Sequence, residues 1–185
     1  MISEKIKKEC SVKGTAEISI KKPKQSDGKD LWMIAKQTGV LDLNSSYSYN
    51  LIATHFSETS AVTFLEDKPA GFLSAYLIPK SPQILFIWQI GVMPQYQGKG
   101  FAFAMIKNVL SRQVCQKVTS INTTITPSNT ASRKLFQKVS HLLNAEFNCS
   151  SFYSPMDFPD THEEEDLITI GPFNTKPNEG GFYEN

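Results

Sequence analysis

The chain is poor in cysteine, in net charge and in long apolar runs. Its 185 residues include only three cysteines, Cys10, Cys115 and Cys149, which lie far apart and without the spacing of paired ligands. This pattern argues against a disulfide framework and against a zinc site, so we expect no bound metal. It is typical of a protein kept in a reducing compartment.

Charge and hydropathy exclude two further classes of protein. The formal net charge is +1, so the chain lacks the strong positive field that holds nucleic acid or an anionic membrane surface. No apolar run approaches the roughly 20 residues of a membrane-spanning helix. The beginning, "MISEKIKKEC", lacks the apolar stretch of a signal peptide. We therefore expect a cytoplasmic protein with neither a nucleic-acid nor a membrane partner.

The chain does have the composition of an ordinary globular domain, with 40% hydrophobic and 20% charged residues. We predict a single domain over residues 17–174. A polar, lysine-rich tail (residues 1–16) precedes it, and a second tail (residues 175–185), which contains a proline and two adjacent glycines, follows it.

The spacing of apolar residues predicts alternating helices and strands. Helices are predicted at "GKDLWMIAKQTG", "YNLIATHF", residues 101 to about 113 and "SNTASRKLFQKVSHLL", the last with Ser128 or Asn129 as its N-cap. Strands are predicted at "SIKKP", on either side of the turn "EDKP", and at "ILFIWQIGVM", "SINTTITP", "AEFNCSSFY" and "DLITIGPF". The run "ILFIWQIGVM" fits a central strand buried on both faces, broken at Gly91 by a bulge or by a close backbone approach. The expected fold class is α/β (α+β).

Two glycines stand one residue apart directly before a predicted helix, in "QYQGKGFAFAMIK". Gly98 and Gly100 would lie at the helix N-terminus, where N–H groups and the helix dipole attract phosphate, and Lys99 would add charge at the rim. The P-loop pattern fails because no glycine lies five residues before Gly98, and the dinucleotide pattern lacks its third glycine. An ordinary flexible loop is the structural alternative.

The hexapeptide "QGKGFA" fits Q-x-x-G-x-A, which resembles the acetyl-coenzyme A signature [RQ]-x-x-G-x-[GA] of the GNAT N-acetyltransferases. The strand "IGVMP" before it, the helix after it and the segment "SNTASRKLF" resemble the same family, over roughly residues 60–145. The resemblance implies a GNAT-like central mixed sheet flanked by helices. It also implies acetyl-CoA as the cosubstrate.

A narrower resemblance extends over five segments in the same order. They are "PKQSDGKDLW", "LDLNSSYSYNLIATHFSETS", "LFIWQIGVMPQYQGKGFA", "TTITPSNTASRKLF" and "HEEEDLITIGPF". These segments are similar to the L-2,4-diaminobutyrate N-acetyltransferases, which acetylate the 4-amino group of diaminobutyrate on the route to the osmolyte ectoine. The resemblance implies this activity, with a role in osmoprotection. Small amine acetyltransferases of this kind are often dimeric, so we expect a homodimer, with Phe152 and Tyr153 as interface candidates.

The resemblance also assigns the cofactor-binding residues. Two strands of the family fold splay apart beside "WQIGV", where backbone N–H groups would bind pantetheine and polarise the acetyl oxygen, and Gly91 is where the splay could start. The turn before the helix would hold the pyrophosphate, and Asn129 the pantetheine arm. The predicted cofactor-binding residues are Ile90, Gly91, Val92, Gln97, Gly98, Lys99, Gly100, Phe101, Ala102 and Asn129.

A substrate with two ammonium groups and one carboxylate needs carboxylates and neutral donors around it. The predicted substrate-binding residues are Asp42, Asn44, Tyr47, Trp88, Gln89, Thr124, Glu163 and Glu165. An alkyl amine has a pKa near 10, so it must lose a proton before it attacks a thioester. Glu163 or Asp42, or a water chain leading from one of them, is the predicted proton acceptor. Because no cysteine lies near the expected acetyl site, we predict direct attack in a ternary complex.

Structural alternatives stay open for several of these residues. Asp42 could cap the following helix, Trp88 could be a core residue, and "EEED" could be a solvated acidic loop. His162 could be a surface ion partner and His55 a structural residue. Phe136 departs from the broad family, since many members carry a tyrosine near this point that protonates the leaving thiolate. The general acid is therefore unassigned.

Two alternative functions follow. The chain could acetylate another small amine, such as a polyamine, or it could be a non-catalytic coenzyme A-binding module, which the missing tyrosine favours. An RNA-binding role for "QYQGKGFAFAMIK" is disfavoured by the near-zero net charge and by the helical spacing of its aromatic residues.

Overall fold

The computed structural model describes residues 17–174, so both predicted tails lie outside the described residues. The strands are β1 (Ile18–Lys21), β2 (Ala61–Leu65), β3 (Lys68–Ile78), β4 (Ser81–Val92), β5 (Ser120–Ile125), β6 (Phe147–Tyr153) and β7 (Glu165–Ile170). The helices are α2 (Gly28–Thr38), α3 (Ser46–His55), α4 (Phe101–Leu110) and α5 (Thr130–Leu142). Short 3-10 turns are η1 (Gln25–Asp27), η2 (Pro94–Tyr96), η3 (Gln113–Cys115) and η4 (Pro155–Asp157). Among residues 17–174, no helix is both long and apolar enough to cross a membrane.

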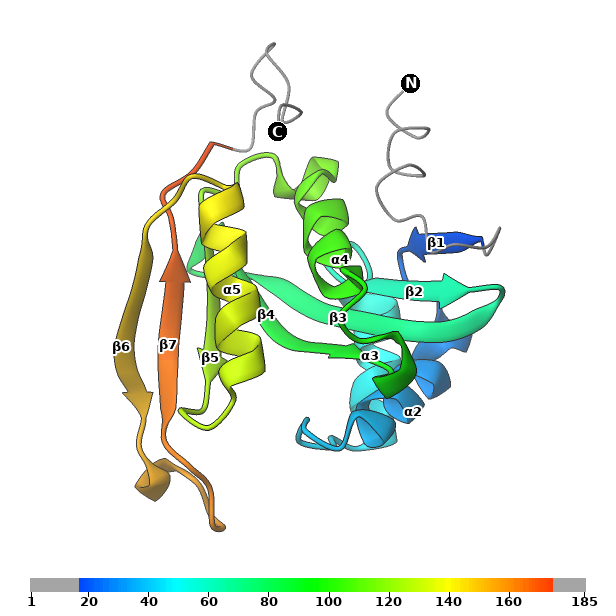
Figure 1. Ribbon diagram of the computed structural model, residues 1–185, viewed down its shortest axis with the longest axis horizontal. Coiled ribbons are helices and arrows are strands. Elements are labelled where there is room, and N and C mark those ends of the chain that lie inside the picture. The colour runs from blue at the N-terminus through cyan, green and yellow to red at the C-terminus, as the bar shows by residue number, and fades with distance from the viewer. Residues whose placement is uncertain (1–16, 175–185) are drawn as a thin grey trace. The chain divides into compact units, whose positions relative to one another are not determined.

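The strands follow the order β1-β2-β3-β4-β5-β7-β6 (Figure 1). Strands β4 and β5 are parallel, whereas β1–β2, β2–β3, β5–β7 and β6–β7 are antiparallel. The predicted fold class, a mixed sheet with flanking helices, is confirmed. The chain divides into two compact units, of which unit 1 is Met1–Ser74 with Gln89–Val109 and unit 2 is Ala75–Trp88 with Leu110–Asn185.

In unit 1, helices cover both faces of the strands (Figure 1). Side chains alternate along a strand, so Gly71 and Phe72 of β3 face opposite sides. Phe72 belongs to a buried cluster with residues of α2, α3 and β2 and with Met93, namely Leu31, Ile34, Ala35, Tyr49, Ile52, Val62, Phe64 and Met93. A Cβ atom on Gly71 would instead lie 3.2 Å from Met105 Cε, so α4 packs against the other face.

One expectation for β4 is wrong, and a second is refined. The strand is not buried on both faces, since burial alternates along it, and Gln89 is 6% exposed while Trp88 is 45% exposed. The strand also continues through Gly91 to Val92 without a break. The close approach at Gly91 exists, but it comes from side chains, because a Cβ atom there would lie 3.0 Å from Leu41 Cδ1 and 3.1 Å from Phe72 Cε1.

Two element boundaries also differ from the prediction. The turn between β2 and β3 is tighter than "EDKP", because Glu66 and Asp67 alone adopt positive φ, at 49° and 61°, and Lys68 already belongs to β3. Positive φ at two central residues is the geometry that matches the twist of a hairpin. Helix α4 ends at Leu110 rather than near residue 113, where η3 follows.

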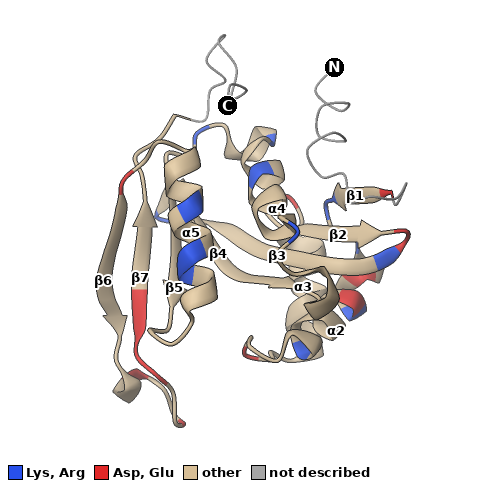
Figure 2. Cartoon of the chain, viewed as in Figure 1, with Lys and Arg blue, Asp and Glu red and all other residues tan. Residues whose placement is uncertain are grey.

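In unit 2, β7 lies between β5 and β6, and α5 packs along these strands (Figure 1). Arg133 of α5 donates to Asp166 Oδ2 of β7 at 2.8 Å and to Cys149 Sγ of β6 at 3.4 Å. Figure 2 shows this charge pattern, with basic residues along α5 and acidic residues at the start of β7. Phe136 and Val139 lie on the buried face of α5, so Phe136 is a core residue.

Candidate active site

The turn before α4 is open at the two positions where the sequence has glycine. Gly98 and Gly100 adopt φ values of 73° and 83°, which side chains rarely tolerate. Among the described residues other than the immediate chain neighbours, no atom lies within 4 Å of a Cβ atom built at either position. Ala104 N donates to Gly100 O at 3.0 Å, so the N–H groups before Ala104 point out of the start of the helix. Open space, backbone donors and the helix dipole together fit a pyrophosphate group.

Side chains of the same turn hold its shape. Gln97 Nε2 donates to Val92 O at 3.1 Å, which ties the turn to the end of β4. The Lys99 ammonium lies 5.4 Å from the centre of the Tyr96 ring, and Tyr96 packs edge-on against Phe101. Phe101 is 1% exposed and anchors the first turn of α4 in the core of unit 1.

Gln89 lies at the centre of a buried group of hydrogen bonds in unit 1. Its Nε2 donates to Asp42 O at 2.7 Å, and its Oε1 accepts from the Tyr49 hydroxyl at 3.2 Å. Its backbone N–H donates to Ser74 Oγ at 3.1 Å. Sequence reasoning missed Tyr49 and Ser74 as hydrogen-bond partners of Gln89, although each has a hydroxyl group among otherwise apolar residues. Buried polar groups of this kind require partners.

The segment 40–45 connects α2 to α3 and carries the predicted residues Asp42 and Asn44. Asp42 is exposed and Asn44 is half-buried, while Tyr47 in the first turn of α3 is 68% exposed. Ser45 is the N-cap of α3, since its hydroxyl accepts from Ser48 N at 3.3 Å. The interpretation of Asp42 as the helix cap is therefore wrong.

In unit 2, the start of α5 holds one of the predicted carboxylates. Asn129 is the N-cap of α5, and its Oδ1 accepts from Ser132 N at 3.0 Å. Ser128 Oγ donates to Glu163 Oε1 at 2.6 Å, and Ser128 N lies 3.4 Å from Glu163 Oε2. Glu163 is exposed, but it is held in place and is not simply part of a solvated loop. Sequence reasoning missed Ser128 as its partner.

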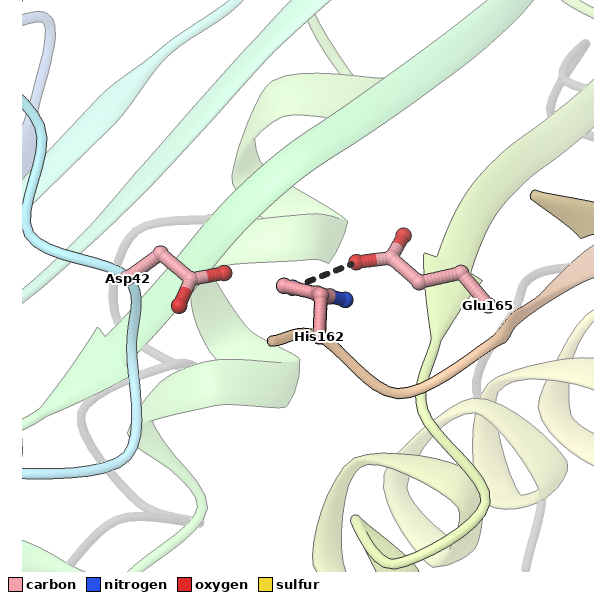
Figure 3. A group of neighbouring side chains, drawn as sticks. All are labelled: Asp42, His162 and Glu165. Atoms are coloured by element: carbon pink, nitrogen blue, oxygen red, sulfur yellow. Dashed lines mark ion pairs between the residues drawn. The ribbon is translucent and has the colours of Figure 1, made fainter. Parts of the chain in front are cut away.

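Two other residues of "HEEED", His162 and Glu165, also have definite neighbours. His162 Nε2 lies 3.8 Å from Glu165 Oε1, the ion pair drawn as a dashed line in Figure 3. The His162 ring stacks on Phe158 at a centroid distance of 3.9 Å, and its Nδ1 lies 2.6 Å from Glu163 O. Interpreting His162 as an ion partner therefore agrees with its surroundings.

The parallel hydrogen-bonded ladder between β4 and β5 is short. It joins Ile84 to Ser120, Leu85 to Ile121 and Phe86 to Asn122, although β4 continues to Val92 and β5 to Ile125. Thr124, beyond the end of this ladder, pairs with Leu167 of β7. Backbone groups past the end of a ladder need other partners, and a bound ligand is one source of them.

The sequence of the chain matches a known protein family. Residues 29–141 match the family model of the Acetyltransferase (GNAT) family. The chain belongs to the GNAT acetyltransferase family. Among its GNAT relatives, the L-2,4-diaminobutyric acid acetyltransferase of Marinococcus halophilus is 40% identical, over 82% of this chain and 88% of that protein. The corresponding protein of Virgibacillus pantothenticus is 41% identical, over 81% of this chain and 95% of that protein.

A solved GNAT structure extends this likeness to the fold. Diaminobutyrate acetyltransferase EctA from Paenibacillus lautus, in complex with its substrate L-2,4-diaminobutyric acid and coenzyme A, is 34% identical to this chain. The TM-score is 0.82, and the alignment covers 92% of this chain and 98% of that chain. The predicted enzyme class, an acyltransferase with acetyl-CoA as cosubstrate, is confirmed. The open glycine positions before α4 fit this cosubstrate.

Proposed function

We propose that this GNAT acetyltransferase transfers the acetyl group of acetyl-CoA to the 4-amino group of L-2,4-diaminobutyrate and gives N4-acetyl-L-2,4-diaminobutyrate, a step of ectoine biosynthesis. The observation that carries the proposal is the 34% identity and TM-score of 0.82 to the Paenibacillus lautus enzyme, whose structure contains this diamino acid and coenzyme A. The relatives near 40% identity that are named L-2,4-diaminobutyric acid acetyltransferase support it.

The proposed cosubstrate site uses backbone groups more than side chains. Acetyl-CoA supplies the activated acetyl thioester. The N–H groups of the turn at Gly98 and Gly100 would hold its pyrophosphate, with Lys99 at the rim. Backbone N–H groups of residues 90–92 would orient the pantetheine and stabilise negative charge on the acetyl oxygen. Asn129 would hold the pantetheine arm.

Carboxylates carry the proposed recognition of the amine. Asp42 would bind an ammonium group of the substrate, and Glu165 would add negative charge. Glu163, whose two oxygens face Ser128, is the proposed proton acceptor, with Asp42 as the second candidate. The remaining proposed substrate contacts are Asn44, Tyr47, Trp88 and Thr124. Trp88, at 45% exposed, is available as an aromatic wall and is not a core residue.

The protonation state of the Cys115 thiol agrees with direct attack by the amine. Burial raises the pKa of the Cys115 thiol from 9.0 to about 11, so this thiol is neutral near pH 7 and a poor nucleophile. Cys115 and Cys149 are both free thiols, in agreement with a reducing cytoplasm as the proposed location.

A homodimer is the proposed assembly. Strand β6 is last in the strand order, and all its residues except Phe147 are exposed. Phe152 and Tyr153 are 48% and 42% exposed, and their rings pack against each other at 4.4 Å. An edge strand with exposed aromatic residues favours association with a second copy. Light scattering should give twice the mass of the chain.

The proposed activity is tested by measuring free-thiol release from acetyl-CoA with diaminobutyrate, ornithine, lysine, putrescine and spermidine, and by locating the new acetyl group by NMR. We expect strong preference for diaminobutyrate with acetyl at the 4-amino group. Preference for a polyamine would overturn the substrate, and coenzyme A binding without turnover of any amine would overturn the catalytic role.

A further inference from the structure

Gln89 is a buried polar residue whose side chain joins separate segments of unit 1. It is 6% exposed, and its amide contacts the α2–α3 connection through Asp42 O and helix α3 through the Tyr49 hydroxyl. On its own strand, its backbone N–H is paired with Ser74 of β3. Both ends of the amide are thus occupied by protein atoms.

Chemistry fixes the direction of these bonds. A backbone carbonyl only accepts, so the atom that faces Asp42 O at 2.7 Å must be the amide nitrogen of Gln89. The amide oxygen then faces Tyr49, whose hydroxyl must donate. Turning the amide over would place two oxygens 2.7 Å apart, so Gln89 has one orientation, set by Asp42 alone.

The segment that carries Asp42 needs such an anchor. Helix α2 ends at Thr38, with Gly39 as its C-cap, and α3 begins only at Ser46. Within the segment, Leu41 packs against the buried cluster, while Val40 is 73% and Leu43 is 47% exposed. The bond from Gln89 fixes the Asp42 backbone, and therefore the point from which the Asp42 carboxylate projects.

We propose that Gln89 is a positioning residue, which acts on the substrate through the Asp42 backbone that it holds and not by touching the substrate. The inference rests on the proposed function, in which the Asp42 carboxylate binds an ammonium group of diaminobutyrate. Such a charge-assisted hydrogen bond weakens steeply when its geometry is lost. Gln89 therefore controls the KM for diaminobutyrate and leaves the KM for acetyl-CoA unchanged.

A matched pair of variants separates this role from general packing. Gln89→Glu keeps the size of the side chain and the acceptor for Tyr49, but its ionised carboxylate has no donor for Asp42 O, so the variant is assayed at a pH at which this carboxyl group is ionised. Tyr49→Phe removes only the bond from Tyr49. We expect Gln89→Glu to raise the KM for diaminobutyrate about tenfold or more, because the short bond to Asp42 O is replaced by a contact between two oxygens and only the longer bond from Asn44 Nδ2, at 3.5 Å, remains on that carbonyl. The values of kcat and of the acetyl-CoA KM should stay within about twofold.

Tyr49→Phe should lower the melting temperature and keep the diaminobutyrate KM within about twofold of wild type, because the amide is still held by Asp42. Gln89→Met, which has a similar length and no charge, provides the same test if the buried carboxylate of Gln89→Glu prevents folding. Equal changes in KM for Tyr49→Phe and the Gln89 variants would indicate general loss of packing and would overturn the positioning role.

Amide hydrogen exchange of residues 40–45 without ligands tests the anchor independently of the substrate. Exchange should be faster in both Gln89 variants and unchanged in Tyr49→Phe. Unchanged exchange in the Gln89 variants would overturn the anchor, and faster exchange with an unchanged KM would overturn its effect on substrate. If wild type does not turn over diaminobutyrate but exchange responds as expected, the proposed function fails and the anchor stands.

Discussion

Helices α4 and α5 both begin directly after a strand and a turn, and cofactor-binding residues are predicted at both starts, but the two starts differ. At α4, Gly98 and Gly100 leave open space where side chains would be. At α5, the Asn129 side chain accepts from Ser132 N, and the preceding Ser128 binds Glu163. The start of α4 has no side chain at its two glycines, whereas the start of α5 is closed by the side chains of Asn129 and Ser128.

The difference shows that the start of a helix can either be left open for a ligand or be closed by a capping side chain. A side-chain cap contributes about 1 kcal/mol to a helix, and the α4 turn has glycine, with no capping side chain, at both open positions. Its backbone N–H groups therefore remain directed at the proposed phosphate. At α5 the cap secures the helix, so any contribution to the site must come from other atoms of Asn129 and Ser128. Four substitutions test this contrast.

Gly100→Ala should have the largest effect, and Gly39→Ala is its matched control. Both glycines have positive φ, 83° and 67°, and apart from chain neighbours no described residue has an atom within 4 Å of a built Cβ atom. Each substitution should cost about 1–2 kcal/mol of folding free energy by strain. Gly100→Ala alone should also raise the Kd for coenzyme A about 10- to 100-fold, since phosphate loses charge-assisted bonds to the backbone. Calorimetry and melting curves measure both quantities, and wild-type affinity in folded Gly100→Ala would rule out this turn as the phosphate site.

Asn129→Asp should have the next largest effect. Aspartate keeps the oxygen that accepts from Ser132 N, so the helix cap and the melting temperature should persist. It replaces the amide nitrogen, the donor proposed for the pantetheine arm, so the KM for acetyl-CoA should rise up to about tenfold. Asn129→Ala is the control that loses the cap as well, at about 1 kcal/mol. An unchanged KM in Asn129→Asp would restrict Asn129 to capping.

Ser128→Ala tests whether the start of α5 serves the carboxylate of Glu163. Loss of the 2.6 Å bond should lower kcat about fivefold, because an exposed bond to a charged group contributes about 1 kcal/mol. The melting temperature should change little, since Asn129 still caps the helix. The acetyl-CoA KM serves as the internal control. If kcat equals that of wild type, Glu163 does not depend on Ser128 for its role.

Lys99→Met should give the smallest change. The Lys99 side chain is exposed and lies over Tyr96, so its charge is strongly screened. The Kd for coenzyme A should rise about threefold at low salt, and the difference should vanish at high salt, as for surface charge pairs. Titrations at two salt concentrations measure this. A difference that does not depend on salt would indicate that Lys99 shapes the turn and does not attract the phosphate.

The helices, the strands and the glycine turn before α4 could be predicted from the sequence, because each depends on neighbouring residues. Both glycines of the six residues "QGKGFA" adopt positive φ. The predicted burial was wrong where it rested only on the number of apolar residues in a run. The run "ILFIWQIGVM" resembles a strand buried on both faces, yet Trp88 within it is 45% exposed, since a strand turns alternate side chains to opposite faces.

The hydrogen bonds that hold the candidate site could not be predicted in the same way. Gln89 lies 40 positions from Tyr49 and 47 from Asp42, and Ser128 lies 35 positions from Glu163. Nothing in the local pattern at either end of such a pair identifies its partner. Sequence reasoning therefore placed Gln89 and Glu163 near the substrate without finding what orients them.

The sequence by itself determined the family, the cosubstrate, the order of elements and the glycine turn, because short motifs and apolar periodicity depend on residues close along the chain. Only the tertiary structure decided that Ser45 rather than Asp42 caps α3, that Phe136 is a core residue, and that Gln89 holds the Asp42 backbone. These outcomes depend on side chains from distant segments meeting at fixed distances, and packing alone sets those distances.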